Sequence, residues 1–313
     1  MIAVIGVDIG GTKIAATLTT DGATSLIERS RPTPPEARPD ALESVTDAQQ
    51  ALNTGRVALL AAVVALCEEL IQEAAVHQVK VGAVGIGSAG QIDAVNGVVL
   101  DANENLIGWK GTPLAQSLRA ALGVPVYVDN DVRVMALAEC TLGAAQGYQH
   151  VLCITVGTGI GGALVMHGKL WHGAHFSAGE IGYIYGEAGQ TIEQLYAGPA
   201  LERRYKAQMG EPRTLKEIAA HALNGDPGCT MFIQTAAADL GKRLVPLAVF
   251  FDPEALVVGG GIPEIGDLWW QPFLHAFRSY HLDAVRELPV LKATLGNRAG
   301  MIGAALLAKG HLA

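Results

Sequence analysis

The chain has 313 residues, half of them apolar and 17% charged, and its formal net charge is −8. This length is at or beyond what one hydrophobic core commonly holds, so two lobes or domains are expected. No stretch clusters Lys and Arg densely enough to follow a phosphate backbone, which argues against nucleic acid as a partner.

The apolar pattern changes its period repeatedly along the chain, which predicts an α/β fold with helices covering the sheets. The segment Arg31–Pro39, rich in proline, is expected to be a surface excursion within the first lobe. Strands are expected over Ile2–Val7, Ile14–Leu18, Val81–Ile86, Val98–Leu100, Val126–Val128, Val151–Val156, Ala163–Met166 and Ala255–Val258. Helices are expected over Arg56–Val76, Pro113–Leu122, Asp131–Gln146, Leu215–Ala222, Cys229–Val249 and Gly300–Ala308.

Nothing in the sequence indicates a membrane segment. The longest apolar run, Val57–Cys67, is too short to cross a bilayer and is expected to be a buried helix. Met1–Val7 lacks the basic start and cleavage site of a signal peptide, so a cytoplasmic protein is expected. The chain has four cysteines, Cys67, Cys140, Cys153 and Cys229. They are widely separated, which predicts neither a disulfide framework nor a zinc knuckle.

Two glycine-rich turns are the most informative local feature. Asp8–Lys13 (DIGGTK) and Thr155–Gly162 (TVGTGIGG) each follow an apolar run that is typical of a strand. Glycines there leave backbone N–H groups accessible to a phosphate oxygen. A matched pair of such turns indicates a nucleotide clamp.

Two stretches match the G-x-G-x-x-G fingerprint of dinucleotide-binding proteins, Gly85–Gly90 and Gly157–Gly162. That fingerprint binds pyrophosphate only when a helix follows. Both stretches continue into strand-like sequence, so we interpret both as hairpin turns and reject NAD. A P-loop motif is absent from the sequence as well.

Asp131 is the candidate general base. It follows the expected strand Val126–Val128 and begins a helix, whose positive end is expected to keep the carboxylate ionised. The alternative is an ordinary helix N-cap, because Asp is favoured there regardless of function.

Five motifs stand in the order found in the ROK family of repressors and sugar kinases, which the chain resembles over nearly its whole length. They are Asp8–Lys13, Asn130-Asp131, Thr158–Gly162, Ala178–Gly182 and Asp252-Pro253-Glu254 leading to Gly259–Gly261. The resemblance implies two ribonuclease-H-like lobes of the actin/hexokinase superfold around a central cleft that holds ATP, Mg²⁺ and a hexose. The lobes are expected to comprise residues 1–117 with the C-terminal helix 299–313, and residues 118–298.

The resemblance also implies roles for single residues. Asp131 accepts the proton of the sugar 6-hydroxyl, and Asp8 acts on Mg²⁺ through water. Contacts to ATP and its phosphates are implied for Gly10, Gly11, Thr12, Lys13, Thr158, Gly159, Gly260 and Gly261. Contacts to the sugar are implied for Asn105, Asn130, Asp131, Glu180, Tyr183, Glu193 and Gly90.

The chain departs from the family pattern near the anomeric end of the sugar. Tyr183 stands where the family has a histidine, and the zinc-binding cysteine loop is missing, so no zinc is expected. His167, His172 and His175 have the spacing of a loop, which does not favour a metal site. Glucose ranks first as substrate, but an N-acetylhexosamine such as N-acetylmannosamine and a β-glucoside both stay open. Arg133, where the family prefers a small residue, is either a solvated charge or a substrate contact.

The sequence therefore predicts an ATP-dependent hexose kinase. The competing class is a sugar-responsive transcription regulator of the same family, which carries an N-terminal helix-turn-helix domain, whereas here Asp8 begins the kinase lobe almost at the first residue. Polyphosphate as the donor stays open, and a homodimer is expected from the resemblance.

Overall fold

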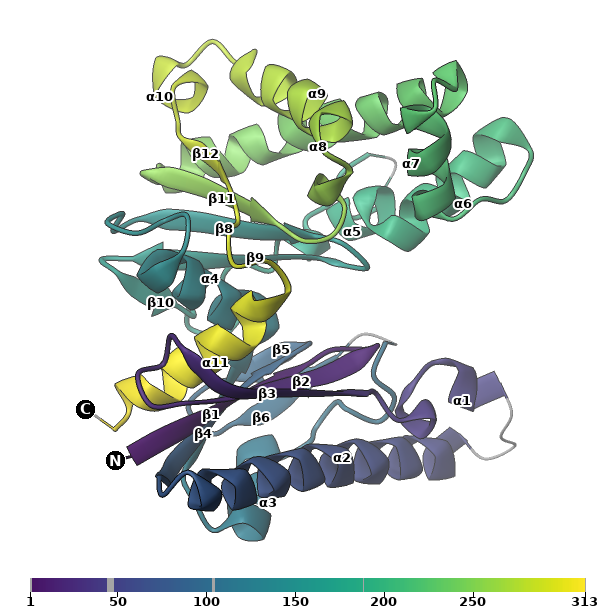
Figure 1. The fold of residues 1–313 in the computed structure, drawn as a ribbon. Coiled ribbons are helices and arrows are strands. Elements are labelled where there is room, and N and C mark those ends of the chain that lie inside the picture. The colour runs from purple at the N-terminus through teal and green to yellow at the C-terminus, as the bar shows by residue number, and fades with distance from the viewer. Residues whose placement is uncertain (1, 44–47, 103–104, 188, 313) are drawn as a thin grey trace. The chain divides into compact units, whose positions relative to one another are not determined.

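The computed structural model describes residues 2–43, 48–102, 105–187 and 189–312 (Figure 1). The chain forms two compact units. The first comprises Met1–Gly143, His172–Ser177 and Asn297–Ala313, and the second comprises Ala144–Trp171 and Ala178–Gly296. The first unit thus extends to Gly143, whereas the sequence-based division falls after residue 117.

The first unit is built on a mixed sheet with the strand order β3-β2-β1-β4-β7. Its strands are β1 (Ile2–Ile9), β2 (Lys13–Thr19), β3 (Ser25–Pro32), β4 (Lys80–Ser88) and β7 (Val126–Asn130). β1, β2 and β3 form antiparallel hairpins, while β4 is parallel to both β1 and β7. The carboxyl ends of β1, β4 and β7 therefore meet at one edge.

Helices cover both faces of this sheet (Figure 1). On one face α2 (Ala48–Val76) packs its buried Leu59, Val63 and Leu66 into a core with the strands, beside α3 (Leu114–Leu122). On the other face lie α4 (Asp131–Leu142) and α11 (Ala299–Gly310). α11 lies so close to β4 that a methyl group at Gly85 would stand 1.8 Å from Ala304 O, which explains glycine in this strand.

The second unit has a sheet with the order β10-β9-β8-β11-β12. Its strands are β8 (Val151–Val156), β9 (Ile160–Met166), β10 (Lys169–Trp171), β11 (Ala255–Gly259) and β12 (Val290–Lys292). The long helix α8 (Pro227–Phe251) packs on α9 (Asp267–Arg278), whose Trp269, Trp270, Phe273 and Phe277 are buried. Shorter helices are α5 (Ile192–Tyr196), α6 (Gly198–Met209), α7 (Leu215–Leu223) and α10 (Asp283–Arg286).

Small elements complete the first unit. β5 (Gln91–Asp93) and β6 (Val98–Asp101) form a two-stranded ribbon, and α1 (Asp40–Glu43) precedes α2.

Within the described part of the chain, no helix is long and apolar enough to cross a membrane.

Most predicted elements are present, with three corrections. Gly85 and Gly87 lie inside β4, and β5 pairs with β6 and not with β4, so the hairpin interpretation of Gly85–Gly90 is wrong. The proline-rich excursion begins later than expected, because β3 continues to Pro32 before a 3-10 helix at Pro35–Ala37. The helix that starts at Asp131 ends at Leu142. The hairpin interpretation of Gly157–Gly162 is confirmed, since β8 and β9 are antiparallel neighbours.

Candidate active site

Three parallel strands of the first unit bring the candidate catalytic residues to one edge. Asp8 of β1 is paired in register with Gly87 of β4, and Gly87 is paired with Asp129 of β7. Asn130 ends β7 and Asp131 begins α4 directly after it. This register places Asp8 and Asp131 at the same edge of the sheet, while their shared catalytic role stays a prediction.

Asn130, and not Asp131, is the N-cap of α4. Its Oδ1 accepts hydrogen bonds from the backbone N–H groups of Val132 (2.9 Å) and Arg133 (3.2 Å). Its Nδ2 donates to Gly90 O and to Asp131 Oδ1, each at 2.9 Å. The ordinary-cap interpretation of Asp131 is therefore wrong, because the cap is the preceding residue.

Burial is the dominant influence on Asp131 and raises the pKa of its carboxyl group. Hydrogen bonds from Val132 N and Asn130 and the positive charge of Arg133 oppose this shift. Desolvation thus outweighs the helix terminus that was expected to keep the group ionised. A carboxylate with a raised pKa is a stronger base, which suits proton abstraction from a hydroxyl.

Asp8 shares this environment. Burial first, and then the charge of Asp131, raise the pKa of Asp8 to about 7, while Lys13 lowers it. The start of α11 lies on Asp8, since a methyl group at Gly300 would stand 2.5 Å from Asp8 Cγ. Asp8 and Asp131 together offer hard carboxylate oxygens at one sheet edge, and such oxygens fit Mg²⁺.

The first glycine turn lies beside the predicted sugar asparagine. Gly10 N donates to Lys13 O at 3.0 Å and closes the β1–β2 hairpin. A Cβ at Gly11 would stand 3.3 Å from both Cβ and O of Asn105, so these two predicted contacts are neighbours. Thr12 is exposed in the same turn. Gly90, with φ +104°, is tied to Asn130 by the hydrogen bond described above.

Buried Trp109 holds the Asn105 segment in place. Its Nε1 donates to Ser88 Oγ at 2.9 Å, and Ile107 N donates to Ala37 O at 2.9 Å. Within this segment only Asn105 was predicted to have a role. Its tryptophan is the signal that could have shown how the segment is anchored to β4.

In the second unit two glycine turns lie side by side. Gly157 N donates to Gly159 O at 2.9 Å, and a Cβ at Gly157 would stand 3.7 Å from Gly261 N. Gly260 has φ +95°, and a Cβ there would stand 2.4 Å from Val156 O, so no larger residue fits. Thr158 is exposed at the tip of its turn. The structure therefore brings the predicted ATP residues of this unit together.

Glu193 supports the same turn. Its Oε2 accepts a hydrogen bond from Ile160 N at 2.8 Å, and a Cβ at Gly159 would stand 2.7 Å from this oxygen. This contact differs from the predicted one to the sugar. Glu180 precedes the 3-10 helix Ile181–Tyr183, where Tyr183 is 61% exposed.

Arg133 is not a solvated charge, and that alternative is wrong. Its side chain is 1% exposed and lies 3.5 Å from the equally buried Asp129, measured from Nη1 to Oδ1. Its Nη2 donates to Phe176 O at 2.7 Å. The contact with Phe176 was not predictable from the sequence, because Phe176 is far from Arg133 in the chain.

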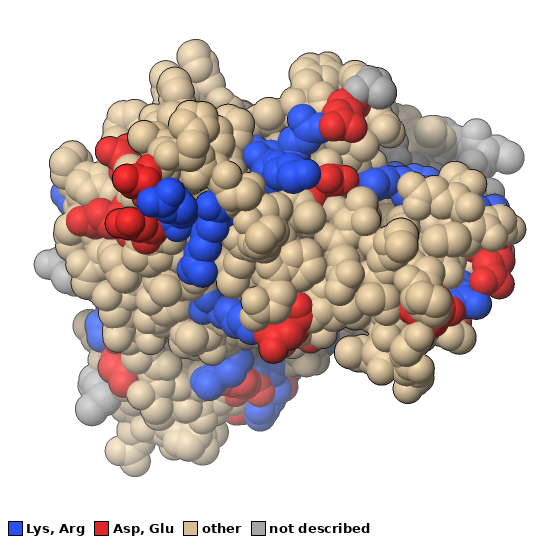
Figure 2. Space-filling model, turned by 90° about the horizontal axis from the view of Figure 1, so that it is seen from above, with Lys and Arg blue, Asp and Glu red and all other residues tan. Residues whose placement is uncertain are grey.

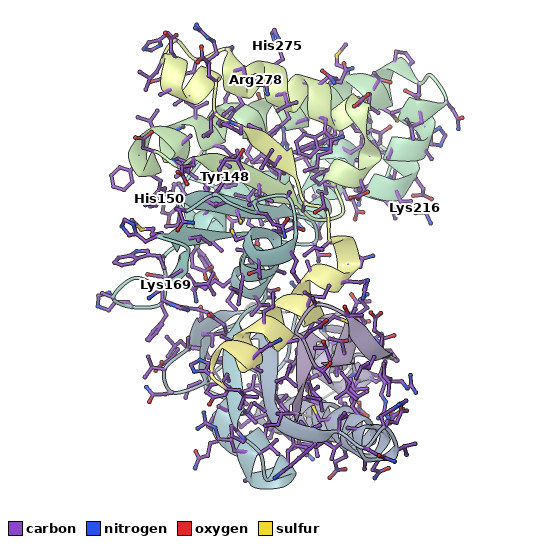
Figure 3. All side chains as sticks on the ribbon, turned by 60° about the vertical axis from the view of Figure 1, so that its left-hand side comes forward. Tyr148, His150, Lys169, Lys216, His275 and Arg278 are labelled. Atoms are coloured by element: carbon purple, nitrogen blue, oxygen red, sulfur yellow. The ribbon has the colours of Figure 1, made fainter. Side chains whose placement is uncertain are left out.

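The three neighbouring histidines do not all belong to the same unit. His172 belongs to the first unit, where its Nε2 lies 2.7 Å from Asp129 Oδ2. His167 belongs to the second unit and packs edge-on against His150, which Figure 3 labels near Tyr148. Across the described residues, no group of three or more His, Cys, Asp or Glu side chains is placed to hold a metal ion. The absence of zinc stays a prediction.

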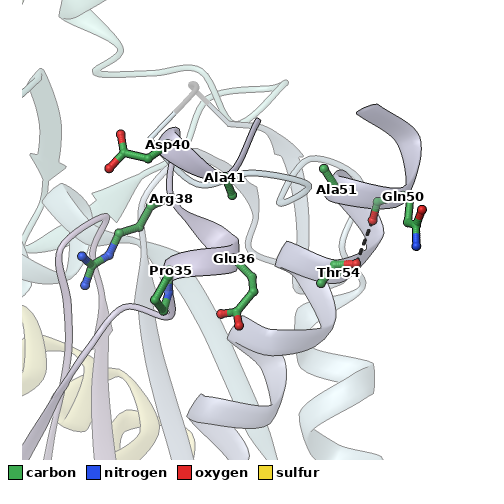
Figure 4. A pocket seen from close by; sticks show the side chains of 8 residues that line it. All are labelled: Pro35, Glu36, Arg38, Asp40, Ala41, Gln50, Ala51 and Thr54. Carbon is green, nitrogen blue, oxygen red and sulfur yellow. Dashed lines mark hydrogen bonds between the residues drawn. The ribbon is translucent and has the colours of Figure 1, made fainter. Parts of the chain in front are cut away.

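A separate cavity of about 480 Å³ lies between the 3-10 helix Pro35–Ala37, α1 and the start of α2 (Figure 4). Its described lining residues are Pro35, Glu36, Arg38, Asp40, Ala41, Gln50, Ala51 and Thr54, which do not include a predicted site residue. The cavity therefore does not mark the carboxylate site.

Comparison with known proteins decides the family. A sequence model described as the ROK family matches residues 48–311. The chain belongs to the ROK family. Its relatives include a glucokinase of Streptomyces coelicolor, 32% identical with 97% of each chain covered, and a β-glucoside kinase of Listeria monocytogenes, 32% identical with 61% of this chain and 67% of that protein covered.

Solved ROK structures agree with this assignment. A ROK family glucokinase from Streptomyces griseus, in complex with glucose and AMPPNP, is 32% identical, covers 98% of this chain and 99% of its own, and has a TM-score of 0.77. A ROK hexokinase from Thermus thermophilus gives the same identity and TM-score, with 99% of each chain covered. The predicted α/β fold of the actin/hexokinase type is therefore confirmed.

Proposed function

We propose that this ROK protein is an ATP-dependent hexose kinase that transfers the γ-phosphoryl group to the sugar 6-hydroxyl, with glucose as the first candidate. The observation that carries the proposal is the pair of carboxylates at one sheet edge, Asp8 and Asp131, with Asn105 beside the glycine turn at Gly11. Similarity to glucokinases along almost the entire chain supports the reaction class.

Asp131 accepts the proton of the attacking hydroxyl. Its Oδ1 already accepts hydrogen bonds from Asn130 Nδ2 and Val132 N at 2.9 Å each, and these bonds fix the plane of the carboxylate. The second oxygen, Oδ2, is the atom assigned to the proton. The raised pKa favours this transfer as the hydroxyl oxygen gains negative charge.

Asn130 acts mainly by orienting Asp131. An asparagine amide has two donors and two acceptor lone pairs. Here the two donors serve Gly90 O and Asp131 Oδ1, and the oxygen accepts from Val132 N and Arg133 N. A direct sugar contact of Asn130 requires the exchange of one of these bonds, so Asn105, Glu180, Tyr183, Glu193 and Gly90 remain the proposed sugar contacts.

Phosphoryl transfer requires positioning and charge neutralisation. Gly10, Gly11, Thr12 and Lys13 in the first unit, and Thr158, Gly159, Gly260 and Gly261 in the second, are the proposed contacts to ATP. Asp8 would hold Mg²⁺ through water. When bound, this ion supplies neutralisation of the phosphate charge.

A β-glucoside is the second candidate substrate. Tyr183 and Tyr185 are 61% and 76% exposed, and aromatic faces of this kind stack on sugar rings. A Listeria β-glucoside kinase is among the relatives. An N-acetylhexosamine is the third candidate.

The remaining expectations are proposals of the same kind. They are ATP in preference to polyphosphate, a homodimer in the cytoplasm, no zinc, and no nucleic-acid or membrane partner. On the face that Figure 2 shows, Lys and Arg lie among Asp and Glu, which is consistent with a small-molecule enzyme.

The test is ADP release with Mg-ATP against glucose, mannose, N-acetylmannosamine, N-acetylglucosamine, fructose and cellobiose. Glucose is expected to give the highest kcat/KM. A preference for cellobiose would establish the β-glucoside alternative. If none of these sugars stimulated ADP release, the proposed function would be refuted.

A further inference from the structure

Three buried or half-buried side chains connect helix α4 to the segment His172–Ser177 within the first unit. Asp129 and Arg133 are each 1% exposed, and His172 is 28% exposed. Asp129 Oδ2 lies 2.7 Å from His172 Nε2, and Asp129 Oδ1 lies 3.5 Å from Arg133 Nη1. We name Asp129, Arg133 and His172 the anchor cluster.

The anchor cluster fixes the segment His172–Ser177 at more than one point. Besides the bond at His172, Arg133 Nη2 donates to Phe176 O at 2.7 Å. Gln91 Nε2 donates to His175 O at 2.8 Å. Phe176 has φ +56°, a left-handed conformation that is uncommon for a bulky residue and needs such support.

The same cluster supports the turn that holds Asp131. Asp129 Oδ1 also accepts a hydrogen bond from Asn130 N at 2.8 Å. Arg133 N donates to Asn130 Oδ1 at 3.2 Å, and Asn130 in turn orients the Asp131 carboxylate. The buried pair of Asp129 and Arg133 is therefore in contact both with the segment His172–Ser177 and with the turn that holds Asp131.

A buried guanidinium and carboxylate lose their hydration, so a well-packed apolar pair at these positions would often be at least as stable. The stability of the fold therefore does not by itself explain why a buried arginine occupies position 133. The two places that the cluster holds each adjoin a proposed sugar-site residue in the chain. One is the Asp131 turn, and the other leads directly into Ala178-Gly179-Glu180.

We propose that Arg133 is a positioning residue for the sugar, which acts through Asp129 and His172 to fix the turn of Asp131 and the segment that precedes Glu180. The inference rests on the proposed function. The ATP turns at Gly157–Gly159 and Gly260-Gly261 belong to the second unit, outside the cluster. Loss of Arg133 therefore weakens sugar binding more than ATP binding.

The experiment compares steady-state kinetics of Arg133→Gln and Arg133→Lys with the unaltered protein. In Arg133→Gln the KM for the sugar is expected to rise by about tenfold or more, because small displacements of positioned groups are costly, while the KM for ATP stays within about twofold. Arg133→Lys keeps the charge but lacks the planar fork that serves two acceptors, so an intermediate KM is expected.

His172→Asn provides a second route if Arg133→Gln does not fold, because His172 is partly exposed and cheaper to replace. It is expected to raise the KM for the sugar in the same selective way. Combined with Arg133→Lys, its effect is expected to be less than additive, since both residues act through Asp129.

Val63→Ala is the matched control, because Val63 is fully buried on α2 in the same unit. It is expected to lower Tm and leave both KM values unchanged. Equal changes in both KM values of the Arg133 and His172 variants, no change, or the same split in Val63→Ala would each overturn the proposal. An unaltered protein without sugar-dependent ADP release would instead refute the proposed function.

Discussion

Gly300 lies directly against the carboxylate of Asp8, because a methyl group at position 300 would stand 2.5 Å from Asp8 Cγ and from its Oδ2. Gly300 is the second residue of α11, so the start of this helix meets the end of β1. The positive end of a helix stabilises negative charge, and this contact partly offsets the burial of Asp8. A glycine is required at this position for that contact to exist.

Gly300→Ala is therefore expected to lower kcat/KM by about tenfold or more, since the added methyl group displaces Asp8. Alanine is favoured over glycine inside helices, so a loss of activity would not reflect poor helix formation. The matched control is Gly310→Ala at the other end of α11, where an added Cβ meets no atom within 4 Å. Steady-state kinetics of both variants test this account, and equal activity of the two would refute it.

Asp8 also predicts how stability depends on pH. Its pKa is raised from an ordinary value of 3.8 to about 7 by burial and by Asp131. Between these values the folded protein keeps a proton that the unfolded chain releases, so the contribution of Asp8 to the free energy of unfolding falls as pH rises through this window. Asp8→Asn, which mimics the protonated form, removes this dependence.

The measurement is Tm against pH for the unaltered protein and Asp8→Asn, both without nucleotide and Mg²⁺. The advantage of Asp8→Asn is expected to grow as pH rises from about 4 to about 7 and to level off above it. Parallel curves would show that the pKa of Asp8 is not raised.

The sequence predicts that Glu193 contacts the sugar, whereas in the structure its carboxylate accepts a hydrogen bond from Ile160 N. Glu193→Ala removes the acceptor for Ile160 N and is expected to raise the KM for ATP, because the turn that carries Thr158 and Gly159 loses its support. Glu193→Gln keeps a carbonyl oxygen as acceptor, so its KM for ATP is expected to stay within about twofold. If both variants raised only the KM for the sugar, Glu193 would be a sugar contact without a supporting role.

The buried strands were predictable from the sequence because their apolar runs are continuous. β3 was missed since its sequence SLIERSRP is mostly polar, and Leu26 is 47% exposed. α9 was missed because Pro272 interrupts its helical pattern, and β12 has only three residues. Such elements are stabilised by their neighbours in the fold and not by local sequence.

In the candidate site, too, some residues were predictable from the sequence and some contacts were not. Asp8, Asn130 and Asp131 stand next to recognisable glycine turns and strand ends, so their types and places were predictable. The partners of Arg133 were not, because Phe176 is 43 residues away and joined by no regular spacing. The role of Asn130 as the cap became evident only from the two hydrogen bonds that its Oδ1 accepts from Val132 N and Arg133 N.

The central claim, that Asp131 is the general base of a sugar kinase, is tested most directly by glucose-dependent ADP release in Asp131→Asn. Asp21→Asn is the control, since Asp21 lies in the exposed turn after β2 and caps it through hydrogen bonds that an asparagine can still accept. Asp131→Asn is expected to lower kcat by about 10²–10⁴-fold with an unchanged fold, while Asp21→Asn keeps full activity. Full activity in Asp131→Asn would contradict the account.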